Sequence, residues 1–136
     1  MVGRPVSTIE QYLPSATPNP VLVPGPAKKV TIHLNEDTAA SEDFLFTEIF
    51  EFLLSHGVAG ASLIRPAAGF GFHHRVHESE AGRSHHEHMP IRIEFIESAD
   101  KVAELVPELC RRLSDGLIEA HDTFIYKSAH QRESPL

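Results

Sequence analysis

The residues with the clearest capacity for chemistry are histidines, and they gather in one stretch of the chain. Six of the ten histidines lie between Gly69 and Pro90. They form two groups: His73, His74 and His77, then His85, His86 and His88. Neutral imidazole is a good ligand for zinc and other divalent transition metals, and Glu78, Glu80 and Glu87 could complete a coordination sphere. The stretch therefore invites a metal-binding interpretation.

The spacing of these histidines leaves two interpretations open. Neither H-H-x-x-H nor H-H-x-H is a specific metal-binding spacing, and no cysteine supports either group. One hypothesis is a divalent transition-metal site, zinc being one candidate, and its ligands would be His73, His74, His85, His86 and His88. The other is a mobile, solvated loop whose histidines pair locally with acidic neighbours.

Catalysis is the weakest interpretation of this sequence. No Ser-His-Asp or Cys-His arrangement can be built from it, and Cys110 has no general base near it in the chain. Cys110 falls in an expected helix, where a buried structural role is predicted. His33 and His121 fall in expected strands, and they too are predicted to be structural. We expect a protein that is not an enzyme.

Composition narrows the class of protein further. The formal net charge of −7 argues against broad binding to nucleic acid, which needs a basic surface. No apolar run approaches the length needed to cross a bilayer, and the first residues do not resemble a secretory signal. The single cysteine fits a reducing compartment. We expect a cytoplasmic protein that is not inserted in a membrane.

The chain divides into an arm, one domain and a tail. Six of its ten prolines lie in residues 1–27, which predicts a flexible, extended, proline-rich arm. Residues 28–127 are long enough for one domain with one core. Residues 69–88 are expected to form a long loop in that domain, and residues 128–136 a disordered tail.

The hydrophobic periodicity of the domain predicts alternating strands and helices. The expected order is a strand at 28–35, a helix at 44–57, a strand at 60–67, the loop at 69–88, a strand at 90–98, a helix from 98 to 116 and a strand at 117–127. Ser41 and Ser98 are the expected helix N-caps, and Gly57 and Gly116 the expected helix ends. Pro107 should remove a hydrogen bond from the second helix or kink it.

This order predicts an α+β fold of the ferredoxin-like, split βαβ type (βαββαβ). In such a fold, two helices cover one face of an antiparallel sheet. The other face would be an uncovered and partly apolar surface, which folds of this kind often bury by oligomerising.

Residues at the exit of the second strand carry a resemblance to a known family. Arg65 is followed by Ala68-Gly69-Phe70-Gly71 and then by Arg75 and His77, while the first strand ends in Asn35-Glu36. This pattern resembles the PII signalling proteins, and more closely their PII-like relatives of the domain-of-unknown-function 190 family. In that family a strand-end glycine-glutamate stands where this chain has asparagine-glutamate. The resemblance covers about residues 28–127.

The resemblance implies a regulatory module rather than an enzyme. It implies a homotrimer whose sheets face inward and which binds an adenine nucleotide (AMP, ADP or ATP) in clefts between subunits. The implied nucleotide-binding residues are Glu36, Arg65, Gly69, Phe70, Gly71, Arg75 and His77. The 69–88 loop would act on a partner, either a membrane transporter or an enzyme.

Two departures from PII proteins alter the expected ligand set. PII proteins carry a glycine- and lysine-rich phosphate loop before the last strand, whereas this chain has only "RRLSDGL", with Arg111 and Arg112. The long loop also lacks the tyrosine that PII proteins modify. A reduced or different ligand set is therefore expected in place of ATP and 2-oxoglutarate sensing.

Individual residues of the implied site allow two interpretations each. Gly69 and Gly71 either supply a positive φ that the turn needs or let backbone amides approach a phosphate closely. Arg65 either pairs with an acidic neighbour or binds phosphate, to which its planar guanidinium is suited.

Overall fold

The computed structural model describes residues 22–70, 77–78 and 89–130. Its elements, in chain order, are β1 (Gly25–Asn35), α2 (Leu45–Ser55), β2 (Ala61–Ile64), β3 (Ala68–Gly69), β4 (His77–Glu78), β5 (Pro90–Glu97), α3 (Ala99–Arg112) and β6 (Leu117–Ile125). Residues 1–21 and 131–136 lie outside the described part of the chain, so most of the expected arm and tail is not described.

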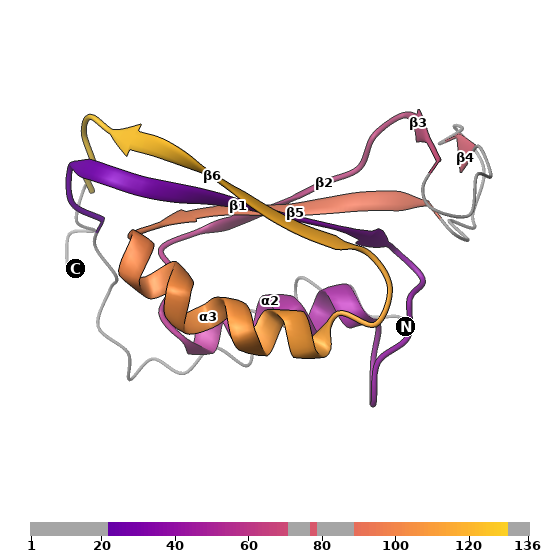
Figure 1. Ribbon diagram of the computed structural model, residues 1–136. Helices are drawn as coiled ribbons and strands as arrows, with labels where there is room; N and C mark the ends of the chain where they lie inside the picture. The colour runs from indigo at the N-terminus through magenta and orange to yellow at the C-terminus, as the bar shows by residue number, and fades with distance from the viewer. Residues whose placement is uncertain (1–21, 71–76, 79–88, 131–136) are drawn as a thin grey trace, which may run out of the picture.

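Four strands form one antiparallel sheet in the order β2-β5-β1-β6. Both helices lie on the same face of this sheet (Figure 1). Strands β3 and β4 form a separate two-stranded sheet. The predicted ferredoxin-like α+β fold is therefore confirmed. Strand β1 begins at Gly25, before the expected start at Lys28, because it continues to pair with β6 as far as Ile125.

The core lies between the sheet and the two helices. In β1 the alternating residues Val30, Ile32 and Leu34 are buried, as the sequence period predicts. The facing residues of β5 and the apolar stripes of both helices complete the core: Ile91, Ile93, Phe95, Leu45, Ile49, Phe52, Leu53, Val102, Leu105 and Leu109. This packing holds the strand ends, and so the residues that follow them, in fixed relative positions.

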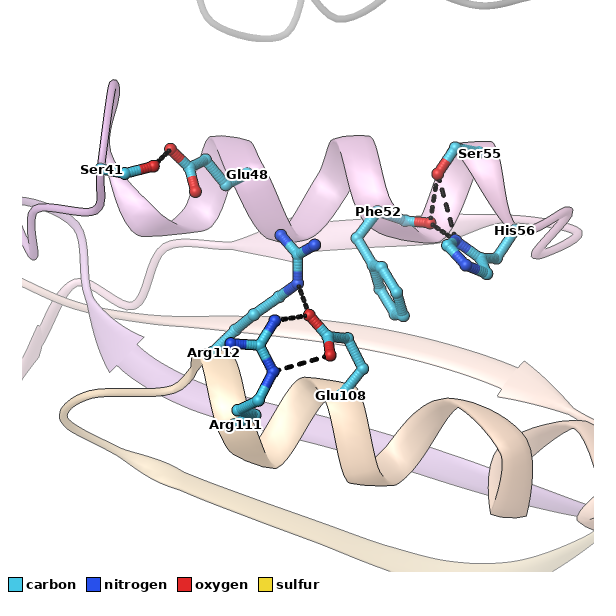
Figure 2. A network of polar contacts seen from close by, with 8 residues as sticks. All are labelled: Ser41, Glu48, Phe52, Ser55, His56, Glu108, Arg111 and Arg112. Carbon is cyan, nitrogen blue, oxygen red and sulfur yellow. Dashed lines mark hydrogen bonds and ion pairs between the residues drawn. The ribbon is translucent and has the colours of Figure 1, made fainter.

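Helix α2 starts later than the expected cap. Its N-cap residue is Phe44, which makes no capping hydrogen bond through its side chain, so the prediction for Ser41 is wrong. Ser41 instead donates its hydroxyl to Glu48, at 3.2 Å, and the Glu42 amide donates to the same carboxylate oxygen at 3.1 Å (Figure 2). The Glu48 carboxylate thus holds the incoming chain against the first turn of the helix. At the other end, Gly57 adopts a φ of 74° and closes α2 as predicted.

Helix α3 begins as predicted but ends earlier. The Ser98 hydroxyl accepts a hydrogen bond from the Lys101 amide at 3.2 Å, which makes Ser98 the N-cap. The helix runs through Pro107 and ends at Arg112, with Leu113 as C-cap, so the prediction that Gly116 ends it is wrong. Gly116 instead forms the turn into β6 with a φ of 141°, where any Cβ atom would collide with the His33 carbonyl.

Side chains of α2 and α3 contact one another through aromatic rings and charged groups. Arg111 and Arg112 both donate to the Glu108 carboxylate, and Figure 2 shows Arg112 directed from α3 toward α2. The Arg112 guanidinium lies 4.9 Å from the centre of the Phe52 ring, and His56 stacks on the same ring at 4.2 Å. Cys110 is exposed on α3, so the predicted burial of this residue is wrong.

The sheet face away from the helices carries apolar as well as charged side chains, so the expected partly apolar surface is present. Ile64, Ile96 and Leu117 lie on it, because they pair with Arg92, Lys29 and His33. Lys29 and Arg92 each lie 3.4 Å from the Glu94 carboxylate, and His33 contacts Glu119 at 2.7 Å. These residues alternate along β1, β5 and β6 with the core residues, so they point to the opposite side. Assembly through this face would bring these charged groups together beside the apolar ones.

Candidate functional site

The candidate site lies where three strands meet at one end of the sheet. Strand β1 ends at Asn35, which pairs with Pro90 at the start of β5. Strand β2 ends at Ile64, which pairs with Arg92 of β5. Antiparallel neighbours run in opposite directions, so the end of β1, the end of β2 and the start of β5 lie at the same end of the sheet. Glu36 and Arg65, the residues that follow β1 and β2, therefore lie together at this end of the sheet.

Glu36 and Arg65 form a bidentate ion pair. The Arg65 Nε donates to Glu36 Oε1 at 3.0 Å, and Arg65 Nη2 donates to Glu36 Oε2 at 2.8 Å. These hydrogen bonds raise the pKa of the Arg65 guanidinium above its usual value. The Arg65 side chain is half exposed, whereas only 15% of the Glu36 side chain is accessible. Of the two interpretations of Arg65, this geometry shows pairing with an acidic neighbour, and it leaves one side of the guanidinium open to solvent.

The backbone fixes Glu36 in place. Its amide donates to the Met89 carbonyl at 2.8 Å, which ties the end of β1 to the residue before β5. Sequence reasoning missed the part played by Met89 and Pro90. The signal available was the abrupt change from polar residues to an alternating apolar pattern at that point.

Gly69 is required for close packing and not for an unusual backbone angle. It pairs with His77, and Ala68 pairs with Glu78, in the small β3–β4 sheet at the base of the loop. Its φ is not among the positive values, which within the described residues occur at Gly25, Gly57 and Gly116. A Cβ atom at Gly69 would lie 3.1 Å from Pro90 Cγ. The interpretation based on positive φ is thus wrong for Gly69, whereas the one based on backbone amides close to a phosphate stays a prediction.

The remaining predicted residues are placed only in part. Phe70 follows β3 with a side chain that is 61% exposed. For His77 the structure describes the backbone pairing alone. The other predicted ligands lie outside the described residues: Gly71, His73, His74, Arg75, His85, His86 and His88. Within residues 22–70, 77–78 and 89–130, no group of three or more His, Cys, Asp or Glu side chains is arranged to hold a metal ion.

The connection between α3 and β6 reaches the same end of the sheet. Leu117 at the start of β6 pairs with His33 near the end of β1. The arginines just before this connection are engaged with Glu108, and their hydrogen bonds, that from Arg111 first, lower the pKa of its carboxyl. This end of the sheet therefore gathers an ion pair from the strands and a second charged cluster from α3.

The chemistry available at this site is binding. A guanidinium and a carboxylate offer donors and acceptors to an anionic, hydroxyl-bearing ligand. No helix within the described residues is long and apolar enough to cross a membrane.

The sheet order and the two helices on one face are those of a ferredoxin-like fold, which this chain shares with solved PII-like structures. The chain belongs to the DUF190 family, described as an uncharacterized ACR, whose model matches residues 27–125. The resemblance stated from the Arg65 to His77 pattern is thus confirmed.

Solved structures with the same fold come from Thiomonas intermedia K12. One is CPII bound to ADP and bicarbonate, with a TM-score of 0.54 and 20% sequence identity over 78% of this chain and 94% of that chain. Another is CPII, a nitrogen regulatory PII-like protein, bound to ADP, AMP and bicarbonate. It has a TM-score of 0.54 and 18% identity over 76% of this chain and 99% of that chain.

Proposed function

We propose that this protein is a PII-like regulatory module that binds an adenine nucleotide in clefts between the subunits of a homotrimer. The observation that carries the proposal is the Glu36–Arg65 ion pair beside Gly69, at the base of the long loop. CPII structures of the same fold are bound to ADP, AMP and bicarbonate, which supports an adenine nucleotide as the ligand. The predicted residues Phe70, Gly71, Arg75 and His77 belong to the same proposed site.

The ion pair suggests how the ligand is held. The exposed side of Arg65 binds a phosphate oxygen, since a guanidinium can donate to two acceptors at once. Glu36 keeps the guanidinium oriented and offers a carboxylate oxygen to a hydroxyl or amino group. We propose binding without catalysis, because both groups serve here as hydrogen-bond donor and acceptor.

Regulation then follows from the position of the site at the base of the 69–88 loop. A ligand shifts a loop only by contacting its two states differently, and a nucleotide beside Gly69 and Phe70 would do so. The ordered or released loop would act on a membrane transporter or an enzyme. A cytoplasmic location stays a prediction from the sequence.

The test is calorimetry of the purified full chain with AMP, ADP and ATP, each with and without Mg²⁺. We expect binding of at least one nucleotide, weakened about tenfold or more in Arg65→Ala, because charge-assisted hydrogen bonds contribute about 1.5–3 kcal/mol. Lys28→Ala is the matched control, since Lys28 forms an ion pair with Asp122 far from the site. Absence of heat with every nucleotide, on folded protein, would overturn the proposal.

A further inference from the structure

An exposed aromatic pair lies at the far end of the sheet from the candidate site. The rings of Phe124 and Tyr126 contact each other in a tilted arrangement, with their centres 5.3 Å apart, and the residues are 54% and 87% exposed. They stand at the end of β6, beside the start of β1, where Phe124 pairs with Pro26. Two aromatic rings in contact at a strand end form an apolar projection, a kind of group that protein interfaces favour.

The same molecule carries an apolar hollow of a size that suits a ring edge. It has a volume of about 80 Å³ and is lined by Phe50, Leu53, Leu54, Val58, Gly60 and Ala61, from the end of α2 and the start of β2. Small-molecule sites are several times larger, at about 300–1,000 Å³, and contain polar groups that orient the ligand. The hollow therefore suits an inserted apolar side chain better than a metabolite.

The strand register places the hollow and the aromatic pair at the same end of the sheet. The Ala59 amide, at the hollow, donates to the Glu97 carboxylate at 2.7 Å. Glu97 pairs with Lys28, and Lys28 pairs with Asp122, so the hollow is level with Asp122. Phe124 lies only one strand repeat further along β6, about 7 Å away along the strand direction.

The two features also share a face but lie at opposite edges. Phe124 alternates in step with Ile118, which packs against the core on the helix side, and the hollow is lined by helix α2 on that side. The aromatic pair is on edge strand β6, whereas the hollow is beside the other edge strand, β2. A projection and a hollow thus lie at one end and on one face, at opposite edges of the sheet.

A ring of copies with cyclic symmetry can use this arrangement when its axis runs parallel to the strands. Rotation about an axis parallel to the strands keeps each copy's ends and faces aligned with those of its neighbours. It brings the β6 edge of one copy to the β2 edge of the next. The contact between them is heterologous, and it closes into a ring when the rotation is a simple fraction of a turn.

We infer that the Phe124–Tyr126 pair of each copy seats in the α2–β2 hollow of the next copy and closes the trimer. This inference rests on the proposed trimer and adds the contact that specifies it. The aromatic pair and the nucleotide site lie at opposite ends of the sheet, so the contact would hold the ring together whether or not a nucleotide is bound.

Disulfide trapping tests the contact directly. The full chain with Cys110→Ser, Gly60→Cys and Tyr126→Cys should form covalent dimers and trimers under mild oxidation, seen on a non-reducing gel. Gly60 tolerates the change, because a Cβ atom there meets nothing within 4 Å. The matched control moves the first cysteine to Ser62, whose side chain points to the other sheet face, and it should cross-link at least about tenfold more slowly.

A loss-of-contact series separates this inference from the trimer itself. Phe124→Ala combined with Tyr126→Ala, and separately Gly60→Phe, should each raise the trimer dissociation constant about tenfold or more by sedimentation, with circular dichroism unchanged. Tyr126→Phe, which keeps the ring, should retain assembly. A trimer that survives the double variant and does not cross-link would overturn the inference and leave the proposed trimer standing. A monomeric wild-type chain would overturn both.

Discussion

Glu51 is a carboxylate on the outer side of α2 with an unfavourable setting. Partial burial raises the pKa of Glu51 above its usual value, and the charges of Glu48 and Asp43 raise it further. Arg112 acts in the opposite direction but more weakly than these. The folded protein therefore holds the ionised form of this side chain at some expense to stability.

Replacing Glu51 by glutamine should stabilise the fold at pH 7. Because the folded pKa is raised above the unfolded value, the folded state binds more protons between the two values, and the penalty is relieved as the pH falls through the folded pKa. Water screens a partly exposed group, so we expect a gain of about 0.5 kcal/mol or less at pH 7 that disappears toward pH 4. Urea unfolding across this range measures it.

Glu104→Gln, an equal charge change on an exposed part of α3, is the control for Glu51→Gln. If the Glu51 variant were less stable than the wild type at pH 7, or if its effect grew as the pH fell, the assigned direction would be wrong.

The sequence predicts some roles of single residues but not others, as the cases of Arg65, Gly69 and Gly116 show. The sequence pattern indicated that Glu36 and Arg65 belong near each other, but not that they bond directly, because that depends on a strand pairing made by β5. The need for glycine at position 69 was predictable, but its reason, the Pro90 ring, was not. Gly116 was assigned to a helix end, since its true neighbour, the His33 carbonyl, is remote in the chain.

Helix α3 contains a proline in its interior and yet remains one helix. Pro107 has no amide hydrogen, so the carbonyl of Ala103 loses its partner in the helical ladder. The residue lies on the exposed side, where water can solvate that carbonyl. The helix is retained because Val102, Leu105 and Leu109 are buried against the sheet.

Pro107→Ala should stabilise the protein by about 1–2 kcal/mol, since a helix-interior proline is disfavoured by about 3 kcal/mol and the freer unfolded chain offsets part of the gain. The measurement is the free energy of unfolding in urea, with Cys110→Ala on the same exposed surface as control. An unchanged or lower stability would show that the proline ring makes a favourable contact in the native state.

The elements themselves were predictable and their ends were not. The order of strands and helices followed from the alternation in β1 and β5 and from the apolar stripes of both helices. An element that buries one face repeats its apolar residues with the period of that element. The extra residues at the start of β1 were missed, because glycine and proline there are typical of a loop. Pairing with β6 nevertheless holds these residues in a strand. All five expected metal ligands lie outside the described residues, and that hypothesis stays a prediction.

The charged groups on the sheet face away from the helices bear on the proposed assembly of the whole molecule. Glu94 lies between Lys29 and Arg92 and balances their charge. If three sheets face one another, removing this carboxylate would leave several cations close together. Glu94→Gln should therefore weaken the trimer about tenfold at low salt and less at high salt, because ions screen repulsion between such groups.

Sedimentation of Glu94→Gln at several salt concentrations, beside the Glu104→Gln control, would measure this effect. If Glu94→Gln assembled as well as the wild type at every salt concentration, the charged groups of this face would lie outside the interface. The trimer would then need another arrangement of its sheets.

The central position of β1 also has a consequence for how the protein is made. This strand is synthesised early, yet both strands that flank it in the sheet, β5 and β6, are encoded much later, the second near the end of the domain. The nascent chain must therefore carry Val30, Ile32 and Leu34 unpaired while most of the remaining domain is translated. Such long-range pairing slows folding and leaves an apolar strand available to other chains. A ribosome that stalls before Leu117 would release a chain whose central strand lacks one of its two neighbours, so this fold can be completed only after translation has passed β6.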